Sequence, residues 1–201
     1  MTHFDFHFDP VCPFAWAASR WLIDRADAHH ASITWHVMSL AILNEDQEPD
    51  SAEQRRQLDT SRRLGRVLTA AAEESGAEVL EPLYSAIGRR LHHRGDQMTP
   101  AVVAETLSEV GLGPGPAEAM DDASFDEALR ASHQRGQDAL GEAGGSPITG
   151  IDGRHFFGPV LSAVPAGDEA EALFTALVTL GGASTFAQFK RPTGGPPTFS
   201  S

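Results

Sequence analysis

Apolar and polar residues alternate at the start of the chain. Between Phe4 and Phe8, aromatic residues are separated by polar ones, and this period of two predicts a short β-strand. From Pro13 to about Ala28, apolar residues recur at helical spacing, and proline suits a first helical position because it has no N–H to donate. Residues 32–40 are rich in β-branched and aromatic side chains, which predicts a second strand. Strand, helix and strand in this order form a βαβ unit with two parallel strands.

The middle of the chain follows a helical pattern. No strand is predicted from Ser51 to Gly141, and an apolar stripe with a period near 3.6 runs from Val79 to Leu91. Thr99 followed by Pro100 is typical of a helix start. We therefore expect a helical region of about four helices here.

Strand patterns return in the last third of the chain. Residues 147–151 and 154–157 flank Asp152-Gly153, a pair typical of a two-residue hairpin turn. An alanine- and leucine-rich helix is predicted over 168–180. Two antiparallel strands and a helix therefore complete the set of elements.

The order of elements predicts an α/β protein with a thioredoxin fold, βαβ followed by ββα, into which helices are inserted. We assign residues 1–45 and 144–190 to the thioredoxin-fold domain. Residues 46–143 form an inserted α-helical subdomain in this interpretation. Residues 191–201 are rich in Pro, Gly, Thr and Ser and are predicted to be a flexible tail.

Composition narrows the classes of function. The chain has 201 residues, 41% of them hydrophobic, and a formal net charge of −13. This charge repels phosphate backbones and anionic lipids, so we expect neither nucleic acid nor membrane binding. No apolar run of about 18 residues is present, so no transmembrane helix is predicted.

The N-terminus and the cysteine count indicate a compartment. The first residues have neither the basic region nor the apolar stretch of a signal peptide, which predicts a cytoplasmic protein. Thiols stay reduced in the cytoplasm, and a single cysteine, Cys12, fits that setting. One cysteine excludes an intramolecular disulfide and a cysteine-based zinc site within one chain.

Nine histidines raise the question of a metal site. Two adjacent pairs, at 29–30 and 92–93, point to different sides of a helix, and no His-Glu-x-x-His motif is present. We therefore predict no metal site and no tightly bound cofactor. His92 follows the apolar stripe and is placed to reach the groove between the two parts of the fold, so we count it among the substrate-binding residues.

Several motifs carry a resemblance to a known family. Cys-Pro-Phe-Ala begins at Cys12 after the first predicted strand, and Gly-Ser-Pro ends at Pro147 before the predicted hairpin. With these motifs the chain resembles the DsbA-like branch of the thioredoxin superfamily. It is similar, more narrowly, to the actinobacterial group that includes mycothiol-dependent nitroreductases. The stretches that carry this similarity are Phe8–Pro13 (FDPVCP), Met38–Glu45 (MSLAILNE) and Phe156–Ser162 (FFGPVLS).

One departure from the family pattern changes the expected chemistry. The redox motif of the family is Cys-x-x-Cys, and here Ala15 stands at the second position. Cys12 can form a mixed disulfide, but no second thiol in the chain can resolve it. Resolution must then come from a small thiol, mycothiol or a similar one as the resemblance implies, or from another protein.

Cys12 is the predicted catalytic residue. A helix N-terminus directs unpaired N–H groups and the positive end of the helix dipole at its sulfur. This placement predicts a thiol pKa below its reference of about 8.5. The alternative is a buried, inert cysteine, as is common for single cysteines in cores.

The resemblance implies that Pro147 is a cis proline lying against Cys12. In that geometry the backbone of Ser146 pairs with an extended thiol-bearing ligand like an added strand, and its hydroxyl is placed to donate to the sulfur. The alternatives are an ordinary strand-edge proline and a serine in a tight turn. Pro13 is counted with these residues as substrate-binding.

Two further positions are candidates for contact with a ligand. Phe14 is predicted to line the ligand groove, whereas the helical spacing of Trp16 places it in the core. Asn44 follows the second strand and is predicted either to contact the substrate or to act in capping or turn formation.

Three functions fit these residues. The first is a monothiol oxidoreductase in which Cys12 attacks a disulfide, or passes electrons to a small electrophile, and a free thiol closes the cycle. The second is a cis–trans isomerase in which Cys12 adds reversibly to a conjugated double bond. The third is a binding protein without redox activity, which predicts that Cys12→Ser leaves function intact.

Overall fold

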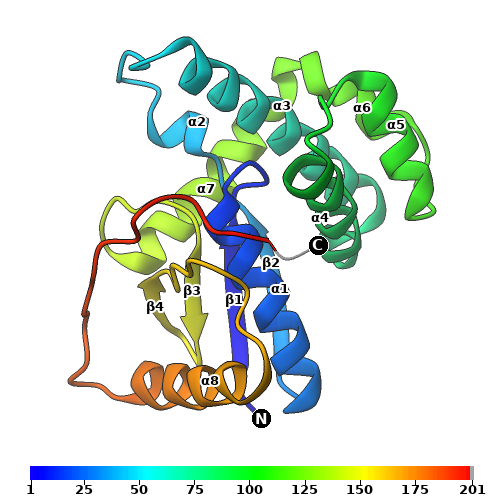
Figure 1. Cartoon of the computed structure of the whole chain (residues 1–201). Helices are drawn as coiled ribbons and strands as arrows, with labels where there is room; N and C mark the ends of the chain where they lie inside the picture. The colour runs from blue at the N-terminus through cyan, green and yellow to red at the C-terminus, as the bar shows by residue number, and fades with distance from the viewer. Residues whose placement is uncertain (200–201) are drawn as a thin grey trace.

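Four strands form one mixed sheet in the order β2-β1-β3-β4 (Figure 1). The computed structural model describes residues 1–199. The strands are β1 His3–Phe8, β2 Ser32–Val37, β3 Ile148–Ile151 and β4 Arg154–Phe157. The helices are α1 Pro13–Ala28, α2 Leu40–Leu43, α3 Ala52–Ser75, α4 Leu80–Gly88, a π-helical turn Arg89–Arg94, α5 Pro100–Glu109, α6 Gly115–Glu118, α7 Asp126–Leu140 and α8 Gly167–Gly182.

The pairing of the strands confirms the predicted thioredoxin fold. β1 runs parallel to β2, with Phe6 opposite Trp35, and antiparallel to β3, with Phe6 opposite Thr149. β3 and β4 form the antiparallel hairpin predicted around Asp152-Gly153, and both residues have the positive φ angles of such a turn. The parallel pair requires a crossover helix, which α1 supplies.

Alternation along β1 gives the sheet two different faces. Phe4, Phe6 and Phe8 are fully buried on one face, where Phe4 packs against Phe174 of α8. His7 points to the other face, where Gly136 of α7 lies against its ring. Helices therefore cover both faces, and the fully buried aromatic side chains contribute about 1.5–3 kcal/mol each.

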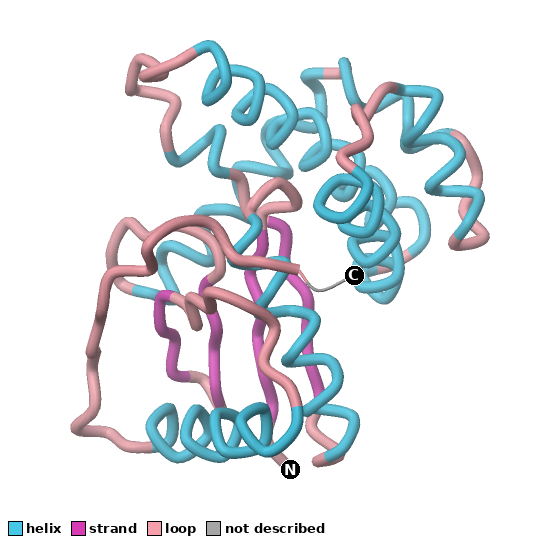
Figure 2. The backbone as a smooth tube through the Cα atoms, viewed as in Figure 1, coloured by secondary structure: helices cyan, strands magenta, loops and turns pink. Residues whose placement is uncertain are grey.

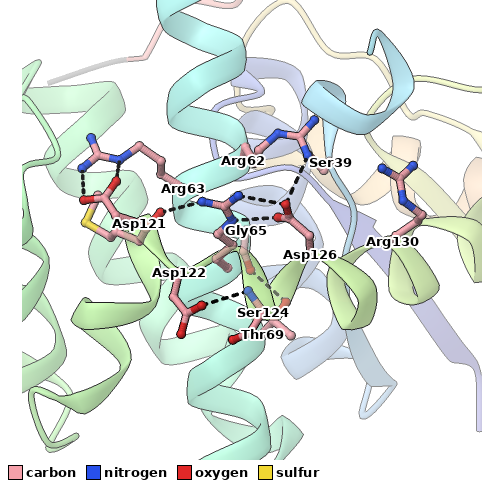
Figure 3. Close-up of polar contacts among 12 residues, drawn as sticks. Ser39, Arg62, Arg63, Gly65, Thr69, Asp121, Asp122, Ser124, Asp126 and Arg130 are labelled. Carbon is pink, nitrogen blue, oxygen red and sulfur yellow. Dashed lines mark hydrogen bonds and ion pairs between the residues drawn. The ribbon is translucent and has the colours of Figure 1, made fainter. Parts of the chain in front are cut away.

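The region between β2 and β3 is helical (Figure 2). Arginines on α3 form ion pairs with later segments of this region. Arg63 pairs with Asp121 at 2.9 Å (Figure 3). Arg66 pairs with Asp126, the first residue of α7, at 2.7 Å. α7 lies within the predicted subdomain 46–143, yet it packs against β2 and β4. The division of the chain into a thioredoxin-fold domain and an inserted subdomain stays a prediction.

The C-terminal segment returns to the body of the molecule. The Thr198 N–H donates to the Ser162 carbonyl at 2.9 Å, and Pro197 is buried. We predicted a flexible tail over 191–201 and did not predict these contacts. Residues 200–201 lie outside the described part of the chain. Within residues 1–199, no helix has the length and apolarity required to cross a membrane.

Candidate active site

Cys12 is the N-cap of α1. Its backbone is extended, with φ −75° and ψ 114°, and Pro13 takes the first helical position as predicted. The Cys12 N–H donates to the Asp9 carbonyl at 3.1 Å, which closes the turn between β1 and α1. The Ala15 N–H donates to the Cys12 Sγ at 3.5 Å. The sulfur therefore receives one of the N–H groups that a helix start leaves unpaired.

A cis proline loop lies against the sulfur. The Ser146–Pro147 peptide bond is cis, as the resemblance implied. The Cys12 thiol donates to the Ser146 carbonyl at 3.1 Å. Ser146 Oγ accepts the Asp9 N–H at 2.9 Å. The Ser146 side chain is also a hydrogen-bond partner that lowers the pKa of Cys12, in line with the donation to the sulfur that we expected. Ser146 therefore contacts both Asp9 and Cys12, and its backbone carbonyl accepts the thiol hydrogen.

Asp9 is a residue of the site that sequence reasoning missed. Its carboxylate is fully buried and accepts the Val11 N–H at 2.8 Å, the Leu40 N–H at 2.6 Å and the Ser61 hydroxyl at 2.5 Å. It connects residues 9–12, which we call the Cys12 turn, to the start of α2 and to α3. In the sequence, Asp9-Pro10 only indicated the end of a strand, because two of the three donors, Leu40 and Ser61, come from distant segments and leave no local signal.

Burial sets the protonation of the two groups of this turn. It raises the pKa of Cys12 to about 11; the Asp9 charge adds to this rise, and the Ala15 N–H opposes it. The predicted lowering of the Cys12 pKa by the helix N-terminus is therefore wrong, because Cys12 is only 5% exposed. Burial likewise raises the pKa of Asp9 to about 6, against the hydrogen bonds that it accepts.

The helical region places His92 beside the Cys12 turn. Arg89–Arg94 is a π-helical turn, a feature that is frequent at functional sites. His92 Nε2 donates to the Pro10 carbonyl at 2.9 Å, and its ring stacks on Trp16 with centroids 5.7 Å apart. Burial lowers the pKa of His92 to about 4, so this histidine is neutral near pH 7.

The remaining predicted residues divide between the site and the scaffold. Phe14 is half-buried and packs against the core next to Cys12, and Trp16 is 1% exposed in the core, as its spacing predicted. Asn44 has the capping role: it is the C-cap of α2, and its side chain donates to the Leu40 carbonyl at 2.7 Å. Ala15 is fully buried. The structure thus brings Pro13, Phe14, His92, Ser146 and Pro147 to the Cys12 turn.

The described residues offer no metal site. No group of three or more His, Cys, Asp or Glu side chains between residues 1 and 199 could hold a metal ion. At the candidate site itself, the Cys12 thiol lies next to a cis proline, and a neutral histidine contacts the same turn.

Several solved structures share the fold of this chain. The chain has the fold of a probable DsbA oxidoreductase from Streptomyces coelicolor (TM-score 0.63, 16% identity, 94% of each chain covered). The cytosolic disulfide reductase DsbM from Pseudomonas aeruginosa, solved with GSH, is also similar (TM-score 0.53, 22% identity, 87% of this chain and 98% of that one). So is a 2-hydroxychromene-2-carboxylate isomerase (TM-score 0.55, 14% identity, 89% and 94% covered). These likenesses show that the chain has the thioredoxin fold in the form that DsbA-like proteins have.

The family follows from the sequence match. Residues 11–191 match the Rv2466c-like family, described as mycothiol-dependent nitroreductase Rv2466c, and the chain belongs to this family. The uncharacterized protein Rv2286c of Mycobacterium tuberculosis is 34% identical over 199 residues, which cover 96% of this chain and 83% of that protein. The resemblance stated from the motifs is thereby confirmed.

Proposed function

We propose that the protein is an enzyme that exchanges thiols through Cys12 alone, with mycothiol or a similar small thiol as cosubstrate. One observation carries this proposal: the chain has a single cysteine, and it lies at the helix start against the Ser146 carbonyl. The mycothiol-dependent family supports the choice of cosubstrate. A reducing cytoplasm, which supplies such a thiol, is the location that fits this reaction.

The reaction runs in two balanced steps. The Cys12 thiolate attacks a mixed disulfide between a substrate thiol and mycothiol, and the substrate leaves as its thiol after taking a proton. A free mycothiol thiolate then attacks the Cys12–mycothiol disulfide and releases oxidised mycothiol and the Cys12 thiol. One substrate disulfide is reduced, and two mycothiols become one disulfide. Because Ala15 stands where the family motif has its second cysteine, the second thiol must come from solution.

The residues around Cys12 have separate roles in this proposal. Pro147 and the Ser146 carbonyl, 3.1 Å from the sulfur, hold an extended thiol in line with Cys12. Pro13 and Phe14 form the apolar wall of the site. His92 fixes the turn through the Pro10 carbonyl and, being neutral, adds no charge beside the incoming thiol.

Burial of the thiol makes the exchange dependent on pH. Only the thiolate attacks a disulfide, and the pKa of buried Cys12 is raised to about 11. The rate of adduct formation should therefore rise about tenfold per pH unit from pH 7 to 9, because the thiolate fraction rises in that proportion.

The test is the reaction of the purified protein with mycothiol disulfide, followed by intact mass. The wild type should gain one mycothiol, lose it again when free mycothiol is added, and react faster as the pH rises. Cys12→Ser should gain none. If Cys12 reacts with iodoacetamide but never accepts mycothiol, the proposal is wrong. A Cys12→Ser protein with full cellular function would instead indicate a binding protein.

A second candidate is cis–trans isomerisation of a conjugated small molecule. The observation that favours it is the dry setting of the sulfur, 5% exposed beside Phe14 and a neutral His92. An apolar site suits reversible addition of Cys12 to a carbon–carbon double bond. Turnover of a conjugated ketone without consumption of thiol, lost in Cys12→Ser, would support this candidate over thiol exchange.

A further inference from the structure

The end of the chain crosses the molecule near the candidate active site. After α8 the segment 187–196 is exposed throughout and passes around the edge of the sheet, as the red tail in Figure 1 shows. Pro197 is then buried, and the Thr198 N–H donates to the Ser162 carbonyl at 2.9 Å. Thr198 also forms a parallel bridge with Ala163. We call residues 187–199 the C-terminal strap.

One side of the strap is bound to the cis-proline side of the site. Ser162 and Ala163 belong to the loop that follows β4. At the start of this loop the Gly158 N–H donates to the Pro147 carbonyl at 2.8 Å, and the Thr149 hydroxyl donates to the Gly158 carbonyl at 2.6 Å. The strap is therefore held by the same loop that is hydrogen-bonded to the cis proline.

The other side of the strap is bound to the helical region. The ring of Phe199 lies 6.0 Å from the ring of His92 and 5.4 Å from that of His93. His92 is hydrogen-bonded to the Pro10 carbonyl, and His93 Nε2 accepts the Trp16 indole N–H at 3.0 Å. Residues 197–199 thus connect the two walls between which the Cys12 turn lies.

We propose that the C-terminal strap closes the mouth of the Cys12 site and that it must detach before a small thiol reaches the sulfur. This inference concerns access to the site and rests on the proposed function for its biological role. The strap is held near its end by a backbone hydrogen bond, a short bridge and a partly buried phenylalanine. Segments with few buried contacts and an exposed linker open at low free energy while the rest of the fold stays intact.

Detachment of the strap is also expected to change the reactivity of Cys12. In the closed state Cys12 is 5% exposed, and burial is the first cause of its raised pKa. Opening returns water to the sulfur, while the Ala15 N–H at the helix start stays in place. The thiolate is therefore favoured in the open state, and apparent reactivity scales with the fraction of open molecules.

The test is the rate at which Cys12 reacts with iodoacetamide in two shortened chains. A chain ending at Pro196 lacks the bound part of the strap, and the control chain ending at Phe199 keeps it. We expect the chain 1–196 to react about 5- to 30-fold faster than wild type, as the loss of a partly buried phenylalanine implies, and at a lower apparent pKa. The control chain should react at the wild-type rate. Equal rates for all three proteins would overturn the proposal.

Point variants provide a matched control for folding. Phe199→Ala should accelerate alkylation, whereas Phe189→Ala should not, because Phe189 is 77% exposed and its ring packs against Phe186, just before the strap. Both variants should keep the thermal midpoint of unfolding within a few degrees. An equal acceleration in both would contradict a specific closure. Alkylation by iodoacetamide needs no mycothiol, so it tests closure by the strap independently of the proposed function. The mycothiol reaction tests the proposed function, and either proposal can fail while the other holds.

Discussion

Two regions of this protein bury titratable groups and use them differently. The Cys12 turn, residues 9–12, lies where β1 ends and α1 begins. The histidine face is the other surface of the sheet, formed by His3, Asp5, His7, His36 and His155. There His7 stacks on His36 with centroids 4.4 Å apart, and its Nδ1 has no hydrogen-bond partner among the described residues.

The difference lies in position and not in the number of reactive groups. The Cys12 sulfur lies at a helix N-terminus and beside a cis proline, at the end of β1. His7 lies in the middle of the sheet beneath α7, and burial lowers its pKa to about 3. His7 therefore packs between the sheet and α7, whereas Cys12 lies at a helix start beside a cis proline, the position that we propose for the reactive thiol. The comparison teaches that the position of a titratable group in the fold is a better guide to a candidate site than the number of such groups in the sequence.

The largest expected effect comes from returning a second thiol to the Cys12 turn. In Ala15→Cys the new thiol lies one helical turn after Cys12, whose sulfur already contacts the Ala15 N–H at 3.5 Å. We expect the mixed disulfide of this variant with mycothiol to release mycothiol without added thiol, leaving a disulfide between Cys12 and the introduced cysteine. The wild-type adduct should persist under the same conditions. Intact mass over time measures both.

A cysteine on the histidine face is the matched control. His155→Cys places a second thiol on β4, on the face of the sheet that α7 covers. Its Cys12–mycothiol adduct should persist like that of the wild type. An adduct that persists in Ala15→Cys, or disappears in His155→Cys, would remove the distinction between the two regions.

The second prediction concerns the pH dependence of stability, which the two regions affect with opposite sign. His7 has a folded pKa of about 3 against 6.5 for the free side chain, so its contribution is full above pH 6.5 and is lost as the pH falls toward 3. Asp9 has a folded pKa of about 6 against 3.8, so its contribution is full below pH 3.8 and is lost as the pH rises through 6.

Two variants separate these contributions. Relative to wild type, His7→Gln should gain free energy of unfolding as the pH falls from 6 to 4, by about 1.4 kcal/mol per pH unit. Asp9→Asn should lose a similar amount over the same range, in addition to a constant cost of about 1–3 kcal/mol for disturbing its hydrogen bonds. Urea unfolding at pH 4, 5 and 6 measures both. Slopes of the same sign would show that the pKa shifts are misassigned.

The smallest effect is expected at the edge of the histidine face. His36 Nε2 pairs with Asp5 at 3.0 Å, and both side chains are about a quarter exposed. His36→Gln should change the free energy of unfolding by less than about 1 kcal/mol, because water and salt screen such pairs. The rate of mycothiol exchange at Cys12 should stay at the wild-type value. A slower exchange would connect the histidine face to the site.

Local sequence signals predicted most elements of the fold. The period of two in β1, Pro13 at the first helical position and Asp152-Gly153 in the hairpin act over a few residues, and each is present where it was predicted. The helix predicted over 168–180 is α8, Gly167–Gly182. Such signals are readable because the backbone geometry they favour depends on neighbouring residues.

The site was predictable in part. Cys12 was predicted from its place at a helix start, and the cis form of Pro147 was implied by the family resemblance. Asp9 was missed because its three donors come from the turn, α2 and α3. The Cys12 pKa was predicted with the wrong sign, since the helix start was visible in the sequence and the depth of burial was not.

The sequence by itself determined the order of strands and helices, the single thiol, the missing second cysteine and the family. Only the tertiary structure decided that Asp9 holds the Cys12 turn, that His92 contacts Pro10, and that the C-terminal strap connects both walls of the site. The physical reason is range. Turn and helix propensities act between neighbours, whereas burial and hydrogen bonding between distant segments exist only after the chain has folded.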